Sequence, residues 1–254
     1  MTIDNRTKIN KLINNWPGGA IYTTEYLINS GYSYQLLDFY KSKKWLERIG
    51  QGAYKRFGDK VQWQGAINAL QKQLGLTIHP GGKTALELTG FAHFLADKMV
   101  NFYLFGHRGE KLPRWYLNYN WDVQTHYTAN QLFRNDTGLK SYRYREFEIL
   151  ISSPERAILE MLYHFPEYHT FDECFHVMEN LTGLQPKLCQ NLLEQCNTIK
   201  VKRMFLFLAE HAEHSWLDSI NTSKLDLGNG KRVLVDGGVY VDKYKITVPK
   251  NYKR

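Results

Sequence analysis

The hydrophobic pattern at the start of the chain predicts three short helices. Apolar residues recur three or four positions apart over residues 6–16, and a Pro-Gly-Gly sequence then ends the pattern. This spacing is typical of an amphipathic helix. Thr23 or Thr24 can cap a second helix that ends at Gly31, and Ser33 can cap a third.

The third predicted helix has one apolar and one polar face. With about 100° of rotation per residue, Leu36, Leu37 and Tyr40 fall on the same side. The opposite arc is polar and can face a ligand. Its members are Tyr34, Gln35, Asp38, Lys41 and Ser42.

A basic hairpin is predicted directly after this helix. Residues 45–57, WLERIGQGAYKRF, contain two strand-like segments around the turn Gly50-Gln51-Gly52, and a glycine-bracketed turn is typical of a β-hairpin. Helices followed by such a hairpin make a winged helix-turn-helix, which we assign to residues 1–60. The alternative is a protein-binding module whose charged residues form only a solvated face.

The positive charge of the chain is concentrated in this region. The sequence has 33 Lys and Arg against 25 Asp and Glu, a net charge of +8. Seven cations between residues 41 and 60 outnumber Glu47 and Asp59, which leaves a local net charge of +5. This favours double-stranded DNA as a partner, with Gln35 reading adenine, Lys41 reading guanine and the wing cations contacting phosphates or the minor groove. The predicted DNA-binding residues are Ser33, Tyr34, Gln35, Asp38, Lys41, Lys43, Lys44, Arg48, Tyr54, Lys55 and Arg56.

The remaining residues, 61–254, predict a larger C-terminal domain of mixed helices and strands, so the fold class is α+β. Aromatic and β-branched segments predict strands, and capping signals and helical periodicity predict helices. The tail, 225–248, alternates strand-like segments with glycine turns, and we expect this meander to complete the earlier sheet. Strands are expected at 99–106, 123–131 and 144–152, and helices at 61–74, 111–118, 153–162, 171–181, 186–195 and 200–211.

One segment imitates a phosphate-binding loop. Gly82-Lys83-Thr84 precedes a predicted helix, and VLVD at 233–236 imitates the magnesium-binding strand that accompanies such loops. However, Thr77 stands where the loop requires its first glycine, so the turn that lets backbone amides hold phosphates is missing. A nucleotide-using enzyme is therefore a disfavoured hypothesis.

Metal-binding and catalytic signals are weak. His211 and His214 lie three residues apart, next to Glu210 and Glu213, but the sequence fixes no third metal ligand. The other histidines, His93 among them, are scattered singly, which favours structural hydrogen bonding. Since no nucleophile, base and orienting group can be combined, we expect no enzyme activity, no cofactor and no metal.

The cysteine pattern and hydropathy predict a cytoplasmic protein. Cys174, Cys189 and Cys196 form an odd set without CxxC spacing, which fits reduced thiols rather than a disulfide framework. No run of about 18 apolar residues is present, so we expect neither a membrane span nor a signal peptide.

Several blocks of the sequence, in order from about residue 7 to 250, resemble the AbiEi-type antitoxins. They are GQGAYKRFG, TIHPGGKTALELTGFAHFL, SSPERAILEML, KVKRMFLFLAE and LDLGNGKRVLVDGGVYVDKYKITVP. The resemblance implies an antitoxin of a type IV (abortive infection) toxin–antitoxin system. Its N-terminal domain would repress its own operon at the promoter, and its C-terminal domain would oppose a nucleotidyltransferase toxin. The alternative is a winged-helix repressor whose C-terminal domain senses a ligand or mediates dimerisation.

A second cluster of cations lies at the start of the helix predicted over 200–211. Lys200, Lys202 and Arg203 can form an anion-binding antitoxin surface, and the alternative is a solvated helix start. The helix dipole does not stabilise cations at this end, because helix N-termini favour acidic residues.

Overall fold

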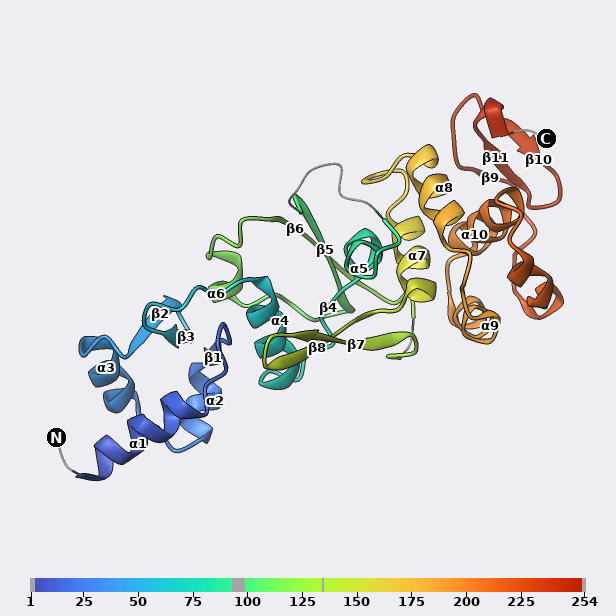
Figure 1. The fold of residues 1–254 in the computed structure, drawn as a ribbon. Helices are drawn as coiled ribbons and strands as arrows, with labels where there is room; N and C mark the ends of the chain where they lie inside the picture. Colours follow the sequence, from blue (N-terminus) through green and yellow to red (C-terminus); the bar gives the residue numbers. More distant parts are fainter. Residues whose placement is uncertain (1–2, 93–98, 134, 253–254) are drawn as a thin grey trace. The chain divides into compact units, whose positions relative to one another are not determined.

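The computed structural model of the chain describes residues 3–92, 99–133 and 135–252 (Figure 1). His93 lies outside these residues. Two compact units are present. The first consists of residues 1–79, 109–124 and 141–150, and the second of residues 80–108, 125–140 and 151–254.

The first unit begins with the predicted winged helix-turn-helix. Its sheet has the strand order β1-β3-β2, with antiparallel pairing throughout. The two predicted caps are confirmed: the Thr23 hydroxyl accepts a hydrogen bond from the Tyr26 amide, and the Ser33 hydroxyl accepts one from the Leu36 amide, both at 3.2 Å. The elements are α1 (Ile3–Asn14), β1 (Tyr22–Thr23), α2 (Thr24–Asn29), α3 (Tyr34–Ser42), β2 (Leu46–Gly50) and β3 (Ala53–Arg56).

The winged helix has a small hydrophobic core of its own. Leu27 and Leu37 are fully buried in it, together with Trp16 and Tyr40. The Trp16 indole donates a hydrogen bond to the carbonyl of Ala20 at 3.0 Å, which closes the turn after α1. Burial of these rings and aliphatic side chains is the main source of stability for so small a body.

Helix α4 (Trp63–Lys72) belongs to the same unit, so the units are not divided at the predicted boundary after residue 60. A Cβ atom at Gly65 would collide with the carbonyl oxygen of Gly19, so only glycine permits this contact. After α4, the Gln73 amide donates to the Ile21 carbonyl and accepts from the Thr23 amide, both at 2.7 Å. The chain that enters α2 is therefore held by residues beyond position 60.

Two later segments return to the first unit. One contains the short helix α6 (Arg114–Leu117), and the other contains most of the hairpin formed by β7 (Leu139–Tyr144) and β8 (Phe147–Ser152). Phe147 packs against the winged-helix core. The Gln71 side chain of α4 also bonds to both the amide and the carbonyl of Leu150, at 2.8 and 2.9 Å.

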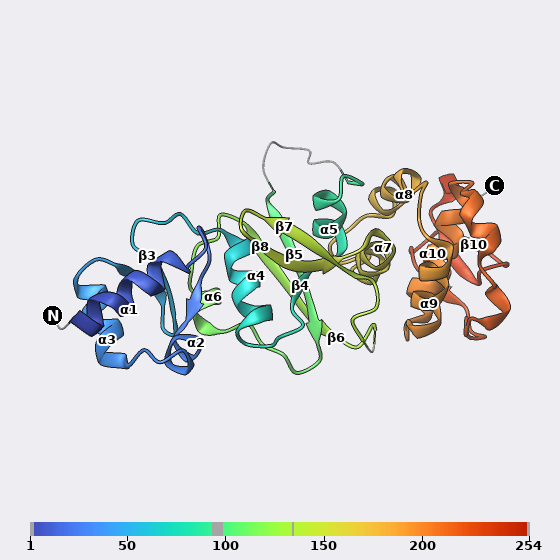
Figure 2. The same cartoon turned by 60° about the horizontal axis from the view of Figure 1, so that its bottom comes forward.

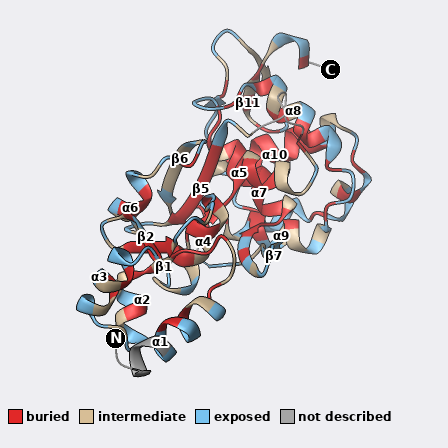
Figure 3. Ribbon diagram, turned by 60° about the vertical axis from the view of Figure 1, so that its left-hand side comes forward, coloured by how far each residue is buried: buried red, intermediate tan, exposed pale blue. Residues whose placement is uncertain are grey.

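The second unit contains most of the predicted α+β domain. Helix α5 lies beside α7 in both views (Figures 1 and 2), and α7 and α10 are buried along most of their length (Figure 3). One sheet has the strand order β4-β5-β6. The elements are β4 (His79–Pro80), α5 (Gly82–Leu88), β5 (Asn101–His107), β6 (Gln124–Asn130), α7 (Pro154–Tyr163), α8 (Phe171–Asn180), α9 (Pro186–Gln195), α10 (Ile199–His211), and the 3₁₀ turns Ser215–Ser219, Thr222–Lys224 and Lys250–Tyr252.

The tail forms a separate sheet, so the prediction that it completes the earlier sheet is wrong. Strands β9 (Arg232–Val233), β10 (Val239–Val241) and β11 (Ile246–Val248) have the order β10-β11-β9. The β10–β11 pair is antiparallel and the β11–β9 pair is parallel. Ile246 and Val248 are buried in the same hydrophobic core as α10, which explains why the tail strands pair with one another there.

Candidate nucleic-acid interface

The polar arc of α3 is exposed as predicted. Leu37 and Tyr40 are fully buried on one side of the helix, while Gln35 and Asp38 are exposed on the other. Tyr34 at the first helical position is 64% exposed. A helix of this kind, with its polar face open to solvent, has the shape and the hydrogen-bonding groups that the major groove accepts.

Two of the predicted DNA-binding residues form an ion pair with each other. The Lys41 ammonium lies 3.0 Å from the Asp38 carboxylate, one helical turn away. Such an exposed ion pair contributes little stability, so both side chains can exchange it for contacts to base edges. Gln35 is also exposed, whereas the Ser33 hydroxyl serves as the helix cap.

Cations surround the end of α3. Lys43 and Lys44 are exposed, and their ammonium groups lie 5.8 Å and 5.9 Å from the rings of Phe39 and Phe57. On β2, the exposed Arg48 stacks over the ring of Tyr54 at 5.7 Å. These aromatic contacts position the charged groups without removing them from solvent. Tyr54 was predicted to bind DNA, but it is only 2% exposed and belongs to the winged-helix core, so this part of the prediction is corrected.

The structure corrects the predicted role of two wing cations. Lys55 is only 9% exposed. Its ammonium donates to the carbonyl of Asp59 at 2.9 Å and lies 3.3 Å from the Glu47 carboxylate. Arg56 is half-buried and bonds to the Asp59 carboxylate at 2.9 Å. Both cations therefore hold the base of the wing together, and the charge that faces solvent is smaller than the sequence indicates.

The tip of the wing is covered by a residue that the sequence analysis did not place there. A Cβ atom at Gly50 would lie 2.9 Å from the Cα of Trp115, and one at Gly52 would lie 3.7 Å from the indole ring. Trp115 belongs to α6 and packs edge-on against Trp121, while the Trp121 indole donates to the Tyr116 carbonyl at 2.8 Å. An aromatic cluster thus supports one side of the wing tip.

The cations predicted to form an antitoxin surface are mostly buried. Arg203 is 1% exposed, and its guanidinium donates hydrogen bonds to four main-chain carbonyls. Lys202 is 3% exposed. Lys200 donates to the carbonyls of Tyr163 and Phe165, and burial lowers the pKa of its ammonium group. The carbonyls that surround Arg203 belong to Leu227, Gly228, Gly230 and Lys245.

The segment that imitates a phosphate-binding loop is occupied by protein groups. The Gly82 amide donates to the Glu160 carboxylate at 3.0 Å. The Thr84 hydroxyl accepts from the Tyr103 amide at 2.8 Å. Lys83 lies 2.6 Å from the Glu173 carboxylate. A carboxylate thus occupies the Gly82 amide, and this further disfavours a nucleotide-binding loop.

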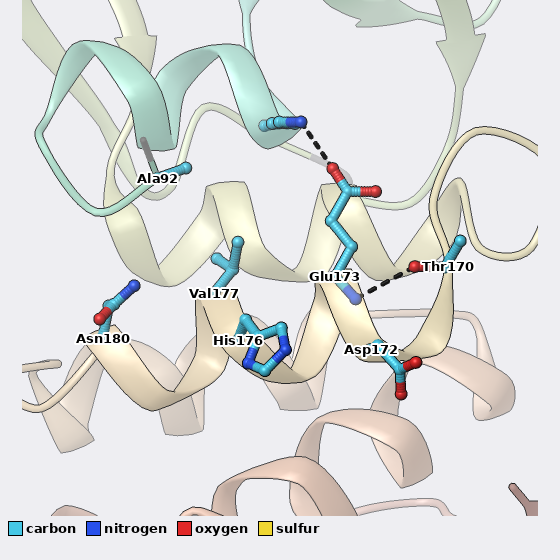
Figure 4. A pocket seen from close by; sticks show the side chains of 8 residues that line it. Ala92, Thr170, Asp172, Glu173, His176, Val177 and Asn180 are labelled. Atoms are coloured by element: carbon cyan, nitrogen blue, oxygen red, sulfur yellow. Dashed lines mark hydrogen bonds and ion pairs between the residues drawn. The ribbon is translucent and has the colours of Figure 1, made fainter. Parts of the chain in front are cut away.

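Figure 4 shows this ion pair of Glu173 beside a cavity of about 540 Å³. Burial opposes ionisation of Glu173, but hydrogen bonds from His169 and Lys83 outweigh it and lower its pKa to about 2. The ion pair therefore fastens α5 to α8. The cavity is lined by Lys83, Ala92, Thr170, Asp172, Glu173, His176, Val177 and Asn180.

The histidines and cysteines have structural surroundings. His214 is buried and bonds to the carbonyl of Met178 at 2.7 Å, and His211 stacks on Phe207. Within the described residues, no group of three or more His, Cys, Asp or Glu side chains could hold a metal ion. All three cysteines are buried, and burial raises the pKa of each thiol. None of the helices in the described ranges is long and apolar enough to cross a membrane.

The elements α1 to β3 at the start of the first unit, with the polar face of α3, have the arrangement found in winged-helix transcription regulators. Residues 5–97 match the family described as "Transcriptional regulator, AbiEi antitoxin N-terminal domain", and residues 100–249 match "Transcriptional regulator, AbiEi antitoxin, Type IV TA system". The chain therefore belongs to the AbiEi antitoxin family of type IV toxin–antitoxin systems. The resemblance seen in the sequence is confirmed.

The fold is also found in a solved structure. The RV2827C protein from Mycobacterium tuberculosis is similar, with a TM-score of 0.61 and 12% sequence identity, over 94% of this chain and 89% of that chain. A comparison with curated protein sequences gives no significant match.

Proposed function

We propose that this antitoxin-family protein represses its own operon by binding promoter DNA with its winged helix. The observation that carries this proposal is the exposed polar arc of α3, on a fold whose corresponding helix enters the major groove. Gln35, together with Asp38 and Lys41, would contact base edges. Lys43, Lys44 and Arg48 would contact phosphates, because these cations face solvent around the same helix.

The salt dependence of DNA binding tests this part. Each neutralised phosphate changes the slope of log affinity against log salt concentration by about −0.9. Replacing Lys43, Lys44 and Arg48 by alanine should therefore make the slope less steep by up to about 2.7. The matched control replaces the exposed cations Lys72, Lys187 and Lys224, and its slope should equal that of the unaltered protein. Absence of any shift of promoter DNA would contradict the proposal.

We propose further that the protein neutralises a nucleotidyltransferase toxin encoded beside it. Membership of a type IV antitoxin family supports this proposal, and the compact α+β second unit offers a surface distinct from α3. The test is growth rescue during co-expression with the adjacent toxin. If the two activities use different surfaces, the triple variant at Lys43, Lys44 and Arg48 will lose promoter repression and still rescue growth. Loss of both activities in a folded variant would refute separate surfaces.

The separation is best tested with point variants of the whole chain. A fragment that begins at Val61 would lose the winged helix but retain α4, whose contacts with residues 19–23 belong to the first unit. If this fragment failed to neutralise the toxin, unfolding of the fragment would explain the failure as well as loss of a contact with the toxin. Surface substitutions leave both cores intact, and their effect on stability should stay within about 0.5 kcal/mol.

A further inference from the structure

A cavity of about 490 Å³ in the second unit has an unusual lining. It is formed by the end of α10, by β10 with the residue after it, and by the last turn of the described chain. Four rings and two carboxylates meet there. They belong to Phe207, His211, Tyr240, Tyr252, Glu210 and Asp242.

The rings are held in place by contacts with the core. His211 stacks on Phe207 with ring centroids 5.6 Å apart and an interplanar angle of 18°, and it lies 5.3 Å from the ring of Tyr252. The Tyr252 hydroxyl donates to the Asp172 carboxylate at 2.7 Å. Phe207 and Tyr252 are buried, with 5% and 6% exposure. Phe207, His211 and Tyr252 are therefore fixed by contacts with one another and with Asp172.

The electrostatic character of the lining favours a cation. The ammonium group of Lys231 lies 4.7 Å from the ring centre of Tyr240, so one ring of the lining already accepts a positive charge. Lys243 pairs with Glu210, and Asp242 is exposed. The faces of aromatic rings and the carboxylates both attract positive charge.

We propose that this cavity binds a small organic cation that carries an alkylated ammonium group. Such a group is weakly hydrated and fits against ring faces, which gives it an advantage over the strongly hydrated ammonium groups of Lys231 and Lys243. The exposed Asp242 carboxylate complements its charge, whereas Glu210 is paired with Lys243. The volume lies within the range typical of small-molecule sites, about 300–1,000 Å³. The site is separate from α3 and does not depend on the proposed DNA binding.

Isothermal titration of the full-length protein with choline tests the proposal. Choline should bind, whereas its neutral isostere, in which a carbon replaces the ammonium nitrogen, should bind at least about tenfold more weakly. The isostere has the same shape and more apolar surface. Equal binding of the two compounds would identify an ordinary apolar pocket and overturn the proposal, as would failure of choline to bind at millimolar concentration.

Variants at two positions locate the site. Tyr240→Leu should weaken choline binding about tenfold, and Tyr240→Phe should restore it, since phenylalanine keeps the ring face. Asp242→Asn should weaken binding, whereas Asp236→Asn, the same change at an exposed aspartate outside the lining, should not. Thermal unfolding of each variant checks that the fold is retained. Choline binding that is insensitive to both Tyr240→Leu and Asp242→Asn would place the ligand elsewhere and refute the assignment.

Discussion

The cations around α3 and those at the start of α10 look alike in the sequence but differ in the folded protein. Lys43, Lys44 and Arg48 remain exposed beside a helix that presents its polar face to solvent. Lys202 and Arg203 are buried, and Arg203 is surrounded by carbonyls of the C-terminal segment. Lysine and arginine side chains are therefore candidate ligand contacts in the first unit, whereas in the second unit Arg203 holds α10 to the C-terminal segment. The difference depends on whether a distant segment of the chain supplies partners.

The largest effect is expected for Arg203→Met. This change leaves four main-chain carbonyls without their donor and should lower the free energy of unfolding by about 3–5 kcal/mol, because several hydrogen bonds from a charged donor, each contributing about 1.5–3 kcal/mol, are lost. Urea denaturation followed by circular dichroism measures it. The matched variant Arg232→Met, at an exposed position, should change stability by less than about 0.5 kcal/mol. A similar small loss for Arg203→Met would mean that the buried network contributes no net stability.

Acid sensitivity should arise in the second unit. Burial lowers the pKa of His164 from 6.5 to about 4, so the folded protein keeps this ring neutral while the unfolded chain takes up a proton. Stability therefore falls as the pH decreases from 6.5 towards 4, by up to about 3 kcal/mol. His164→Gln, which cannot titrate, should flatten this part of the stability profile.

The exposed His176 provides the control for this titration. His176→Gln should leave the profile unchanged, because this ring is exposed and lies outside the buried surroundings of His164. Unfolding free energies measured between pH 4 and pH 7 give the comparison. If the His164 variant and the unaltered protein lost stability in parallel as the pH decreased, His164 would not be the group responsible for the acid sensitivity.

Base preference should respond to Gln35→Ala. Loss of the exposed amide should reduce discrimination at one base pair by about 1–3 kcal/mol, with little effect on stability. Competition binding with a set of promoter duplexes altered one base pair at a time measures the change. Lys44→Ala should instead weaken binding to all the duplexes alike. If Gln35→Ala weakens all of them equally, then its role is a phosphate contact.

The smallest effect is expected at Lys55, and it distinguishes cations that bind protein groups from cations that contact DNA. Because its ammonium is occupied by the Asp59 carbonyl and the Glu47 carboxylate, Lys55→Ala should cost about 1–2 kcal/mol of stability. The salt slope of DNA binding should stay unchanged. Chemical denaturation and filter binding on the same preparation measure both quantities. If Lys55→Ala made the salt slope of DNA binding less steep and left stability unchanged, Lys55 would be a DNA contact.

Local features of the fold could be predicted from the sequence because neighbouring residues determine them. Ser33 and Thr23 cap the helices that follow them, and helix α9 begins at Pro186 and ends at Gln195 as predicted. Strand β7 was not predicted because most of its side chains are exposed or half-buried, so it shows no alternation of apolar and polar residues. Its position depends on pairing with β8 rather than on its own composition.

The candidate site could be predicted only in part for a similar reason. The polar arc of α3 follows from helical periodicity alone, and its exposure matches the expectation. The burial of Lys55 and Arg203 depends on carbonyls four and more than twenty residues away. Trp115, which covers the wing tip, lies more than sixty residues after Gly50. No pattern within a short window of sequence could reveal the contacts of Arg203 and Trp115.

The winged helix shares its unit with segments from much later in the chain, and this has a consequence for biosynthesis. The polypeptide passes from one unit to the other at residues 79/80, 108/109, 124/125, 140/141 and 150/151. During translation the wing therefore remains without Trp115 until residue 115 has emerged from the ribosome, and Gln71 remains without Leu150 until residue 150 has emerged. At about 5–20 residues per second, this delay lasts several seconds. The first unit is therefore completed only while the second unit is already being synthesised. For the same reason, no single proteolytic cut can release one unit without dividing the other.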